Sequence, residues 1–225
     1  MHAPTILIAD DHPLFREALR GSVARVLPQA KLVEADNTEA LYAMAIAHPD
    51  ADLLLLDLNM PGAQGYSALV HLRATQPQLP VIVVSAREEP TVMRRALDHG
   101  AAGFIPKSAD AQTIGTAIAT VLDGGTWAPA SAHAAEGVNA QEAEVAQRLR
   151  ELTPQQFRVL AMVATGLLNK QIAYSMEVSE ATVKAHMTAV MRKLNVGNRT
   201  QAVLLAGKLA LEPDGVVAPP EEHEA

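Results

Sequence analysis

Apolar residues in the first part of the chain gather in short continuous runs, separated by longer stretches with helical spacing. The runs predict strands at residues 5–9, 31–35, 53–57, 81–85 and 103–106, of which 31–35 is the weakest. Continuous rather than alternating runs are typical of strands that helices cover on both faces. The stretches between and after them predict helices at 13–27, 38–48, 65–75, 90–99 and 110–123. Residues 1–125 therefore predict an α/β domain, a five-stranded doubly wound parallel sheet.

The pattern changes after residue 125. Residues 126–150 are rich in Ala, Ser, Glu and Gln, which indicates a linker with a helical portion at "AQEAEVAQRLR". A second unit, residues 151–212, is predicted to be all-α with four helices. Its first helix begins with a capping box, in which Thr153 is the N-cap, Pro154 the first helical residue and Gln156 the third. The other three are expected at about 169–176, 180–194 and 199–210.

Residues 213–225 close the chain with two successive prolines and a cluster of acids. Such a segment has little apolar surface to bury, so it predicts a disordered tail.

Composition narrows the class of protein. The chain has 225 residues, of which 49% are apolar, enough for two cores. It has no cysteine, which excludes disulfides and thiolate metal sites and fits a reducing compartment. We find neither a signal peptide nor an apolar run of about 18 residues, so a cytoplasmic protein with no membrane partner is expected.

Charge is distributed unevenly along the chain. The net charge is −7, yet residues 151–212 hold 7 basic and 4 acidic side chains, whereas residues 1–125 hold 9 and 14. Of the segments, only residues 151–212 have a positive balance, so any contact with nucleic acid is expected there.

Five polar residues follow the predicted strands at their carboxyl ends. Asp10 and Asp11 follow the first strand, and Asp57 ends the third. Ser85 ends the fourth strand and Lys107 follows the fifth. A doubly wound sheet gathers such positions around one crevice. Three neighbouring carboxylates repel each other, which favours a bound Mg²⁺ ion with oxygen ligands.

This set is suited to accept a phosphoryl group. Asp57, held by a buried strand, is the predicted nucleophile, and Asp10 and Asp11 are the predicted metal ligands. Lys107 would neutralise charge on the transferred oxygens, and Ser85 would hydrogen-bond one of them. Each residue alone is more often a solvated turn residue or helix cap. The order of all five along the strands is what favours the site.

The stretches "IADDHPLFREAL", "DLLLLDLNMPGAQGYSAL", "PVIVVSA" and "GAAGFIPKSA" resemble the receiver domains of two-component response regulators, which have a flavodoxin-like fold. The resemblance covers residues 4–125. It implies that a sensor histidine kinase phosphorylates Asp57, and that Asp10 and Asp11 hold Mg²⁺ with the backbone carbonyl of Asn59. It also implies that Ser85 and Phe104 switch on activation and that Lys107 contacts the phosphate. Because Phe104 lacks a hydroxyl, its switch is expected to act through packing.

The predicted helix 180–194 is amphipathic. Its apolar face carries Val183, Met187, Val190 and Leu194, spaced by four, three and four. Small and polar residues lie opposite: Lys184, Ala185, Thr188 and Arg192. Together with the helix before it, this pattern predicts a helix-turn-helix that reads the major groove of double-stranded DNA. The alternative is a plain helical bundle with a solvated basic face, because two helices and a turn are common.

The segment from "LTPQQF" to "NRTQAV" resembles the LuxR-type helix-turn-helix along its full length. That resemblance places Lys184, Ala185 and Thr188 at base edges. It places Asn169, Lys170, Thr182 and Arg199 near phosphates, and basic residues such as Arg192 are expected to add contacts. The whole chain resembles a NarL/FixJ-type response regulator, which implies a homodimer that binds promoter DNA and regulates transcription.

The two alternative functions are an aspartate-nucleophile phosphatase and a constitutive DNA binder. An aspartate-nucleophile phosphatase usually has a second aspartate two residues after the nucleophile, where this chain has Asn59. Because Asn59 cannot act as a general acid, we expect that the protein is not an enzyme. A constitutive DNA binder, whose first domain serves only for docking, stays open, although the intact acids, Ser85 and Lys107 argue against it.

Overall fold

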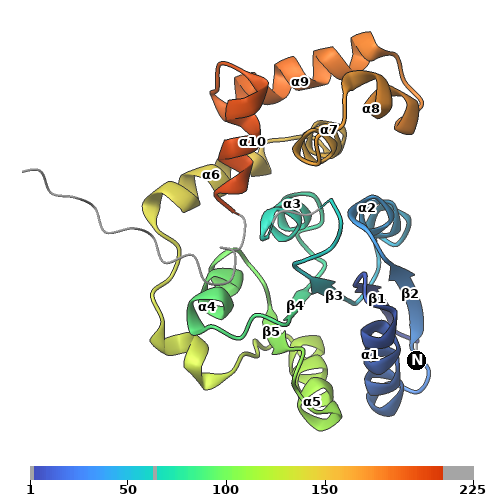
Figure 1. Ribbon diagram of the computed structural model, residues 1–225. Coiled ribbons are helices and arrows are strands. Elements are labelled where there is room, and N and C mark those ends of the chain that lie inside the picture. The colour runs from blue at the N-terminus through green and yellow to red at the C-terminus, as the bar shows by residue number, and fades with distance from the viewer. Residues whose placement is uncertain (1–2, 63–64, 210–225) are drawn as a thin grey trace, which may run out of the picture.

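The computed structural model describes residues 3–62 and 65–209, which form two domains and a bridging segment, residues 126–150 (Figure 1). The N-terminal domain consists of β1 (Thr5–Ala9), α1 (Pro13–Val26), β2 (Lys31–Ala35), α2 (Thr38–Ala47), β3 (Leu53–Asp57), α3 (Ser67–Thr75), β4 (Val81–Ser85), α4 (Pro90–Asp98), β5 (Gly103–Pro106) and α5 (Ala111–Leu122). The bridging segment contains the 3-10 helix η1 (Ala130–Ala134) and α6 (Ala140–Arg150). The C-terminal domain consists of α7 (Pro154–Ala164), α8 (Asn169–Ser175), α9 (Glu180–Leu194) and α10 (Arg199–Gly207).

The five strands pair in parallel in the order β2-β1-β3-β4-β5. Every residue of β1, β3 and β4 is buried, as expected of strands that helices cover on both faces. β2 lies at an edge, and its first residue, Lys31, is exposed. The predicted α/β fold with a second, all-α domain is confirmed. The exact domain boundaries, at residues 125 and 150, stay predictions.

Helices cover the sheet in two layers, with α1 and α5 on one face and α2, α3 and α4 on the other (Figure 1). Side chains alternate along each strand, so Ile8 and Leu55 pack toward α1 and α5. Leu7 and Leu56 pack on the opposite face, in a core that continues into the C-terminal domain. This continuity joins the two domains through apolar contact.

The bridging segment adds to the edge of the sheet at β5. Trp127 donates its N–H to the carbonyl of Ala102 at 3.2 Å, and its own carbonyl accepts from Phe104 at 2.9 Å. A Cβ on Gly103 would lie 2.9 Å from the Trp127 carbonyl oxygen, so this close approach requires glycine. The sequence did not predict this pairing.

Helix α6 confirms the predicted helical portion of the bridging segment, and it does more than link the domains. Val145, Ala146 and Leu149 are buried in the shared core. Arg148 donates to the carbonyl of Leu194, the last residue of α9, at 2.9 Å. Helix α6 is therefore a packed part of both domains.

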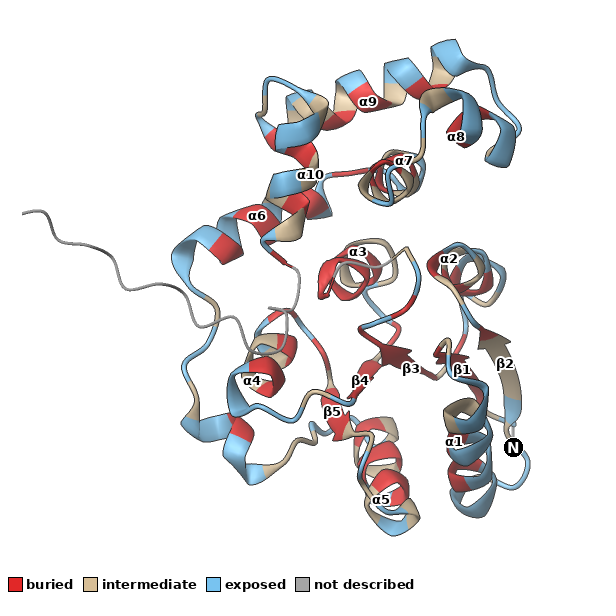
Figure 2. Cartoon of the chain, viewed as in Figure 1, coloured by how far each residue is buried: buried red, intermediate tan, exposed pale blue. Residues whose placement is uncertain are grey.

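In the C-terminal domain, local sequence determines where helices begin and end. α7 begins with the predicted capping box, in which Thr153 and Gln156 hydrogen-bond each other's backbone N–H groups. α9 begins at Ser179, whose hydroxyl accepts from the N–H of Thr182, and ends at Asn195 in the left-handed conformation. The predicted apolar face of α9 is buried: Val183, Met187, Val190 and Leu194 (Figure 2).

An aromatic cluster lies where the domains meet. Phe157 of α7 stacks on His71 of α3 with ring centroids 4.1 Å apart, and Tyr42 of α2 meets both rings edge-on. Arg158 pairs with Glu39 of α2 beside this cluster. The buried Nδ1 of His71 has no hydrogen-bond partner among the described residues. Burial lowers the pKa of His71 from 6.5 to about 4.

The predicted disordered tail, residues 213–225, lies outside the described residues. Within the part of the chain that is described, no helix combines the length and the apolar character needed to cross a membrane.

The buried His71 predicts an acid-sensitive domain interface. Because its pKa is about 4 in the folded chain and 6.5 when exposed, stability is unaffected above pH 6.5 and is lost as pH falls toward 4. Between about pH 7 and pH 5 the wild type is expected to lose about 2 kcal/mol through this residue. His71→Phe, which retains an aromatic ring, should lose correspondingly less, as measured by urea unfolding at both pH values. His133→Gln, at an exposed position, is the control. An unchanged pH dependence in His71→Phe would contradict the role of His71.

Candidate functional site

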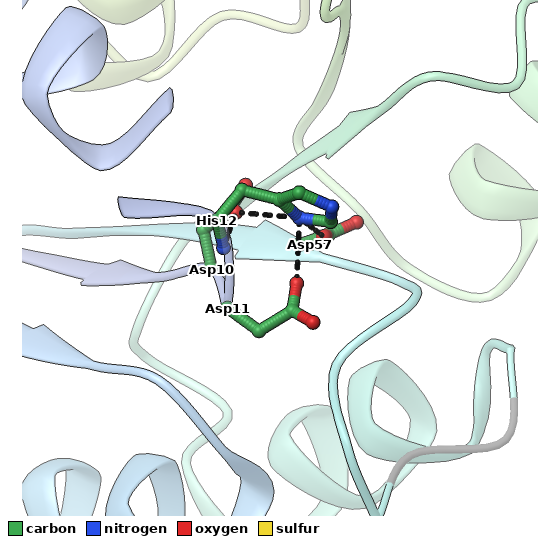
Figure 3. A group of neighbouring side chains, drawn as sticks. All are labelled: Asp10, Asp11, His12 and Asp57. Atoms are coloured by element: carbon green, nitrogen blue, oxygen red, sulfur yellow. Dashed lines mark hydrogen bonds and ion pairs between the residues drawn. The ribbon is translucent and has the colours of Figure 1, made fainter. Parts of the chain in front are cut away.

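Four side chains at the ends of β1 and β3 converge on one point (Figure 3). Asp10 follows β1 and Asp57 ends β3, and both side chains are only 1% exposed. Asp11 and His12 continue the loop that leads into α1. One ligand atom from each of the four lies within 4.8 Å of every other. The parallel strands thus bring together residues that are 45 or more positions apart in sequence.

Lys107 completes the charge arrangement. Its Nζ lies 2.8 Å from Asp57 Oδ2 and 2.7 Å from Asp10 Oδ2. Burial raises the pKa of Asp57, against the opposing effect of Lys107. Burial acts to lower the pKa of Lys107, but hydrogen bonds to Asp10 and Asp57 outweigh it, so this pKa is raised. The ammonium group therefore stays charged between the two carboxylates.

The crevice over Asp57 is open to a small ligand. Its volume is about 520 Å³, and its walls are formed by His12, Leu14, Phe15, Asp57, Asn59, Ala86 and Lys107. The backbone N–H of Asn59 donates to Asp57 Oδ1 at 3.1 Å, which fixes the carboxylate from the side of the following loop. Asp57 thus combines a fixed orientation with access from outside.

Ser85 and Phe104 are both fully buried and do not line this crevice, although Ser85 directly precedes Ala86, which does. The hydroxyl of Ser85 accepts from the N–H of Arg87 at 3.1 Å, and its carbonyl accepts from the N–H of Lys107 at 2.8 Å. Phe104 points into the core that reaches α4 and the C-terminal domain. The structure thus brings Asp10, Asp11, Asp57 and Lys107 together, whereas Ser85 is tied to Lys107 through the backbone and Phe104 belongs to the core.

The donor set fits a hard divalent cation. Asp10, Asp11 and Asp57 offer carboxylate oxygens, which Mg²⁺ prefers. Asp11 Oδ1 is shielded from solvent, and none of the described residues donates a hydrogen bond to it. An unsatisfied carboxylate oxygen in this position is what a cation would neutralise.

Sequence reasoning missed two residues of this site. His12 Nδ1 lies 2.7 Å from Asp11 Oδ1, and Arg16 donates to the backbone carbonyl of Asp10 at 2.7 Å. The position of His12 directly after "DD" was the available signal. Arg16 gave none, because its partner is a backbone atom.

An ionic network links α4 to the bridging segment. Glu142 of α6 is buried and accepts from Arg95 Nε at 2.9 Å and from His99 Nε2 at 2.6 Å. Arg95 also lies over the ring of Tyr66, whose hydroxyl donates to the carbonyl of Val92 at 3.0 Å. Burial lowers the pKa of His99, against the influence of Glu142. This network joins α4 and the residue that follows it to α6.

The polar face of α9 is open to solvent. Lys184, Ala185, Thr188 and Arg192 are exposed, and α9 lies on the side of its domain away from the sheet (Figure 1). The hydroxyl of Thr188 donates to the carbonyl of Lys184 at 2.9 Å, so it is already partnered. Lys184 and Arg192 are left as the longest polar side chains on this face.

The residues predicted to lie near phosphates belong to the first turns of three helices, α8, α9 and α10. Lys170 is exposed, and Thr182 hydrogen-bonds the N-cap Ser179 at 2.9 Å. Arg199 donates to Asn169 Oδ1 at 3.0 Å and to the carbonyl of Leu167. Arg199 therefore helps to position α8, a role that its charge alone did not reveal.

Comparison with known proteins bears on both domains. Residues 6–119 match the family described as response regulator receiver domain, and residues 150–206 match bacterial regulatory proteins, luxR family. The chain is 40% identical over 210 residues to the glycerol metabolism activator of Pseudomonas putida, covering 91% of this chain and 95% of that protein. It is 31% identical over 204 residues to the nitrate/nitrite response regulator NarL of Escherichia coli K12, covering 89% and 93%.

Among solved structures, the RcsB response regulator of Salmonella typhimurium resembles this chain with a TM-score of 0.54 and 25% identity, over 91% of this chain and 98% of that one. A receiver fold followed by a LuxR-type helix-turn-helix defines a DNA-binding transcription regulator. The chain belongs to the two-component response regulators of the NarL/FixJ type.

The network at Glu142 predicts a strong effect of a single substitution. Glu142→Ala leaves Arg95 and His99 without their shared acceptor, which should destabilise the chain by about 3 kcal/mol. Urea unfolding measures this loss. The matched control is Glu144→Ala on the same helix, whose exposed ion pair with Arg148 should contribute less than about 1 kcal/mol. Equal effects of the two substitutions would show that Glu142 has no special structural role.

Proposed function

We propose that a sensor histidine kinase phosphorylates Asp57 and that this phosphorylation controls DNA binding by the C-terminal domain. The observation that carries the proposal is the position of Lys107 Nζ, within 2.8 Å of Asp57 and Asp10. A phosphoryl group on Asp57 would add oxygens at this point, and Lys107 would stabilise their charge. The crevice above Asp57 gives a donor phosphohistidine room to approach.

Mg²⁺ is the proposed cofactor of this reaction. Asp10, Asp11 and Asp57 would hold it with the backbone carbonyl of Asn59. When bound, the ion supplies charge neutralisation at the transferred phosphoryl oxygens. The carboxylate of Asp57 would supply the attacking oxygen, and Ser85, at the end of the adjacent strand, would hydrogen-bond a phosphoryl oxygen.

Phosphorylation would reach the second domain through packed contacts. Phe104 belongs to the same buried core as residues of α4, and the side chains of Arg95 and His99 pair with Glu142 of α6. Since the polar face of α9 is exposed while the domains are in contact, its own receiver does not cover it. Control of DNA binding is therefore proposed to act through the relative placement of two chains in a homodimer rather than through uncovering of α9.

The proposed output is regulation of transcription at promoter DNA, not turnover of a substrate. Asn59, two residues after Asp57, cannot supply the general acid that an aspartate-nucleophile phosphatase uses. Lys184 and Arg192 would contact base edges or phosphates, and Lys170 and Thr182 phosphates. The cytoplasm, where kinase and DNA are both available, is the proposed location.

Asp57 is the proposed phosphoryl acceptor. Acetyl phosphate with Mg²⁺ should add one phosphoryl group to the wild type and none to Asp57→Asn, because the amide is not a nucleophile. Intact-mass spectrometry measures the addition. Asp50→Asn, at an exposed position, removes the same charge and should be phosphorylated normally. Phosphorylation of Asp57→Asn at the wild-type level would exclude Asp57 as the acceptor.

Lys184 is a proposed DNA contact. Lys184→Ala should weaken binding to DNA that the wild type selects from a random-sequence pool, by about 1–3 kcal/mol if Lys184 meets a base. If Lys184 meets a phosphate instead, the slope of log affinity against log salt should fall by about one. Fluorescence anisotropy across a salt series distinguishes the two. Lys208→Ala removes the same charge beside α6, and its affinity should match the wild type. Unchanged affinity and slope in Lys184→Ala would exclude the contact.

A further inference from the structure

The imidazole side chain of His12 lies among the three carboxylates of the acidic site (Figure 3). Its Nδ1 faces all three carboxylates, at 2.7 Å from Asp11 Oδ1, 3.4 Å from Asp10 Oδ1 and 4.0 Å from Asp57 Oδ2. The imidazole side chain is 64% exposed, so the apolar core does not hold it there. The acidic site is thus not built from oxygen donors alone.

A hydrogen bond holds the backbone of His12 in place, whereas its imidazole ring does not cap the helix α1 that follows. Its N–H donates to Asp10 Oδ1 at 2.8 Å, which ties the loop to the site. His12 is the N-cap of α1, but its side chain makes no capping hydrogen bond. The contacts of the imidazole with the carboxylates are therefore not a by-product of helix capping.

The distances around His12 Nδ1 match the edges of a coordination shell. An octahedral ion with bonds of about 2.1 Å places adjacent ligand atoms about 3.0 Å apart and opposite ones about 4.2 Å apart. The contacts with Asp11 and Asp10, at 2.7 and 3.4 Å, bracket the first value, and that with Asp57, at 4.0 Å, approaches the second. Asp11 Oδ1 accepts no regular hydrogen bond from a described residue, and its 2.7 Å contact with His12 Nδ1 is an ion-pair contact.

We propose that His12 is a metal ligand through Nδ1 and that this site takes a divalent first-row transition-metal ion in addition to Mg²⁺. Imidazole favours ions such as Ni²⁺, Fe²⁺ and Zn²⁺, whereas Mg²⁺ selects oxygen. His12 Nδ1 joins Asp11 and Asp57 on the transition-metal ion. The proposal rests on the proposed function in using the same carboxylates. It adds that the identity of the bound ion depends on His12.

The test measures metal binding directly on the full-length chain without a histidine tag. By isothermal titration calorimetry, His12→Ala should lower the affinity for Ni²⁺ by about tenfold or more. The affinity for Mg²⁺ should stay within about twofold of the wild type, because Mg²⁺ does not require the imidazole. His12→Gln, which retains a polar side chain of similar length, should behave like His12→Ala. His133→Ala, which removes an exposed histidine far from the site in sequence, should leave both affinities unchanged.

A second readout reports contact rather than affinity. With Mn²⁺ bound, pulsed electron paramagnetic resonance should detect hyperfine coupling to a ¹⁴N nucleus in the wild type and in His133→Ala, and none in His12→Ala. Absence of that coupling in the wild type, an equal loss of Ni²⁺ and Mg²⁺ affinity in His12→Ala, or no loss of Ni²⁺ affinity would each overturn the proposal.

These outcomes are separate from those that test the proposed function. Failure of acetyl phosphate with Mg²⁺ to modify Asp57 would contradict phosphorylation while leaving the Ni²⁺ and Mn²⁺ results intact. Conversely, normal phosphorylation with unchanged Ni²⁺ binding in His12→Ala would contradict only the role of His12.

Discussion

The contact of Lys107 with two buried carboxylates is the interaction on which the rest of the site depends. Asp10 and Asp57 are almost completely buried, and burial of two like charges side by side is costly unless a cation lies between them. Lys107 supplies that cation from the end of β5, so the four strands β1, β3, β4 and β5 must be in register before the site exists. The parallel sheet is thus the condition for the chemistry, and its leucine and valine runs are what hold the charges in place.

Much of the fold was predictable because a strand that is buried on both faces has a continuous run of apolar residues. The run 53–57 is apolar up to its last residue, and only a strand between two helical layers satisfies that pattern. The capping box at Thr153 likewise depends on neighbouring residues alone. Asp10, Asp11, Asp57 and Lys107 lie close together for the same reason, since each ends or follows a strand of the parallel sheet.

What escaped prediction depends on contacts between distant segments. Glu142 looked like a solvated residue of a linker helix, yet it is buried against Arg95 and His99, more than 40 positions away. His71 lay within an ordinary helical pattern, and it is buried between Tyr42 of α2 and Phe157 of the other domain. Arg199 looked like a phosphate ligand, but it also hydrogen-bonds the start of α8. No local pattern encodes such partners, because each residue is compatible with a solvated position.

The pairing of Trp127 with β5 covers an edge of the sheet that could otherwise bind another molecule. A parallel sheet ends in a strand whose outer N–H and C=O groups can recruit a strand from another molecule, which is a common route to aggregation. Here the backbone of Trp127 takes up the outer groups of Ala102 and Phe104. The segment that joins the two domains therefore also protects the β5 edge of the sheet from self-association, and any larger residue at Gly103 would expose that edge.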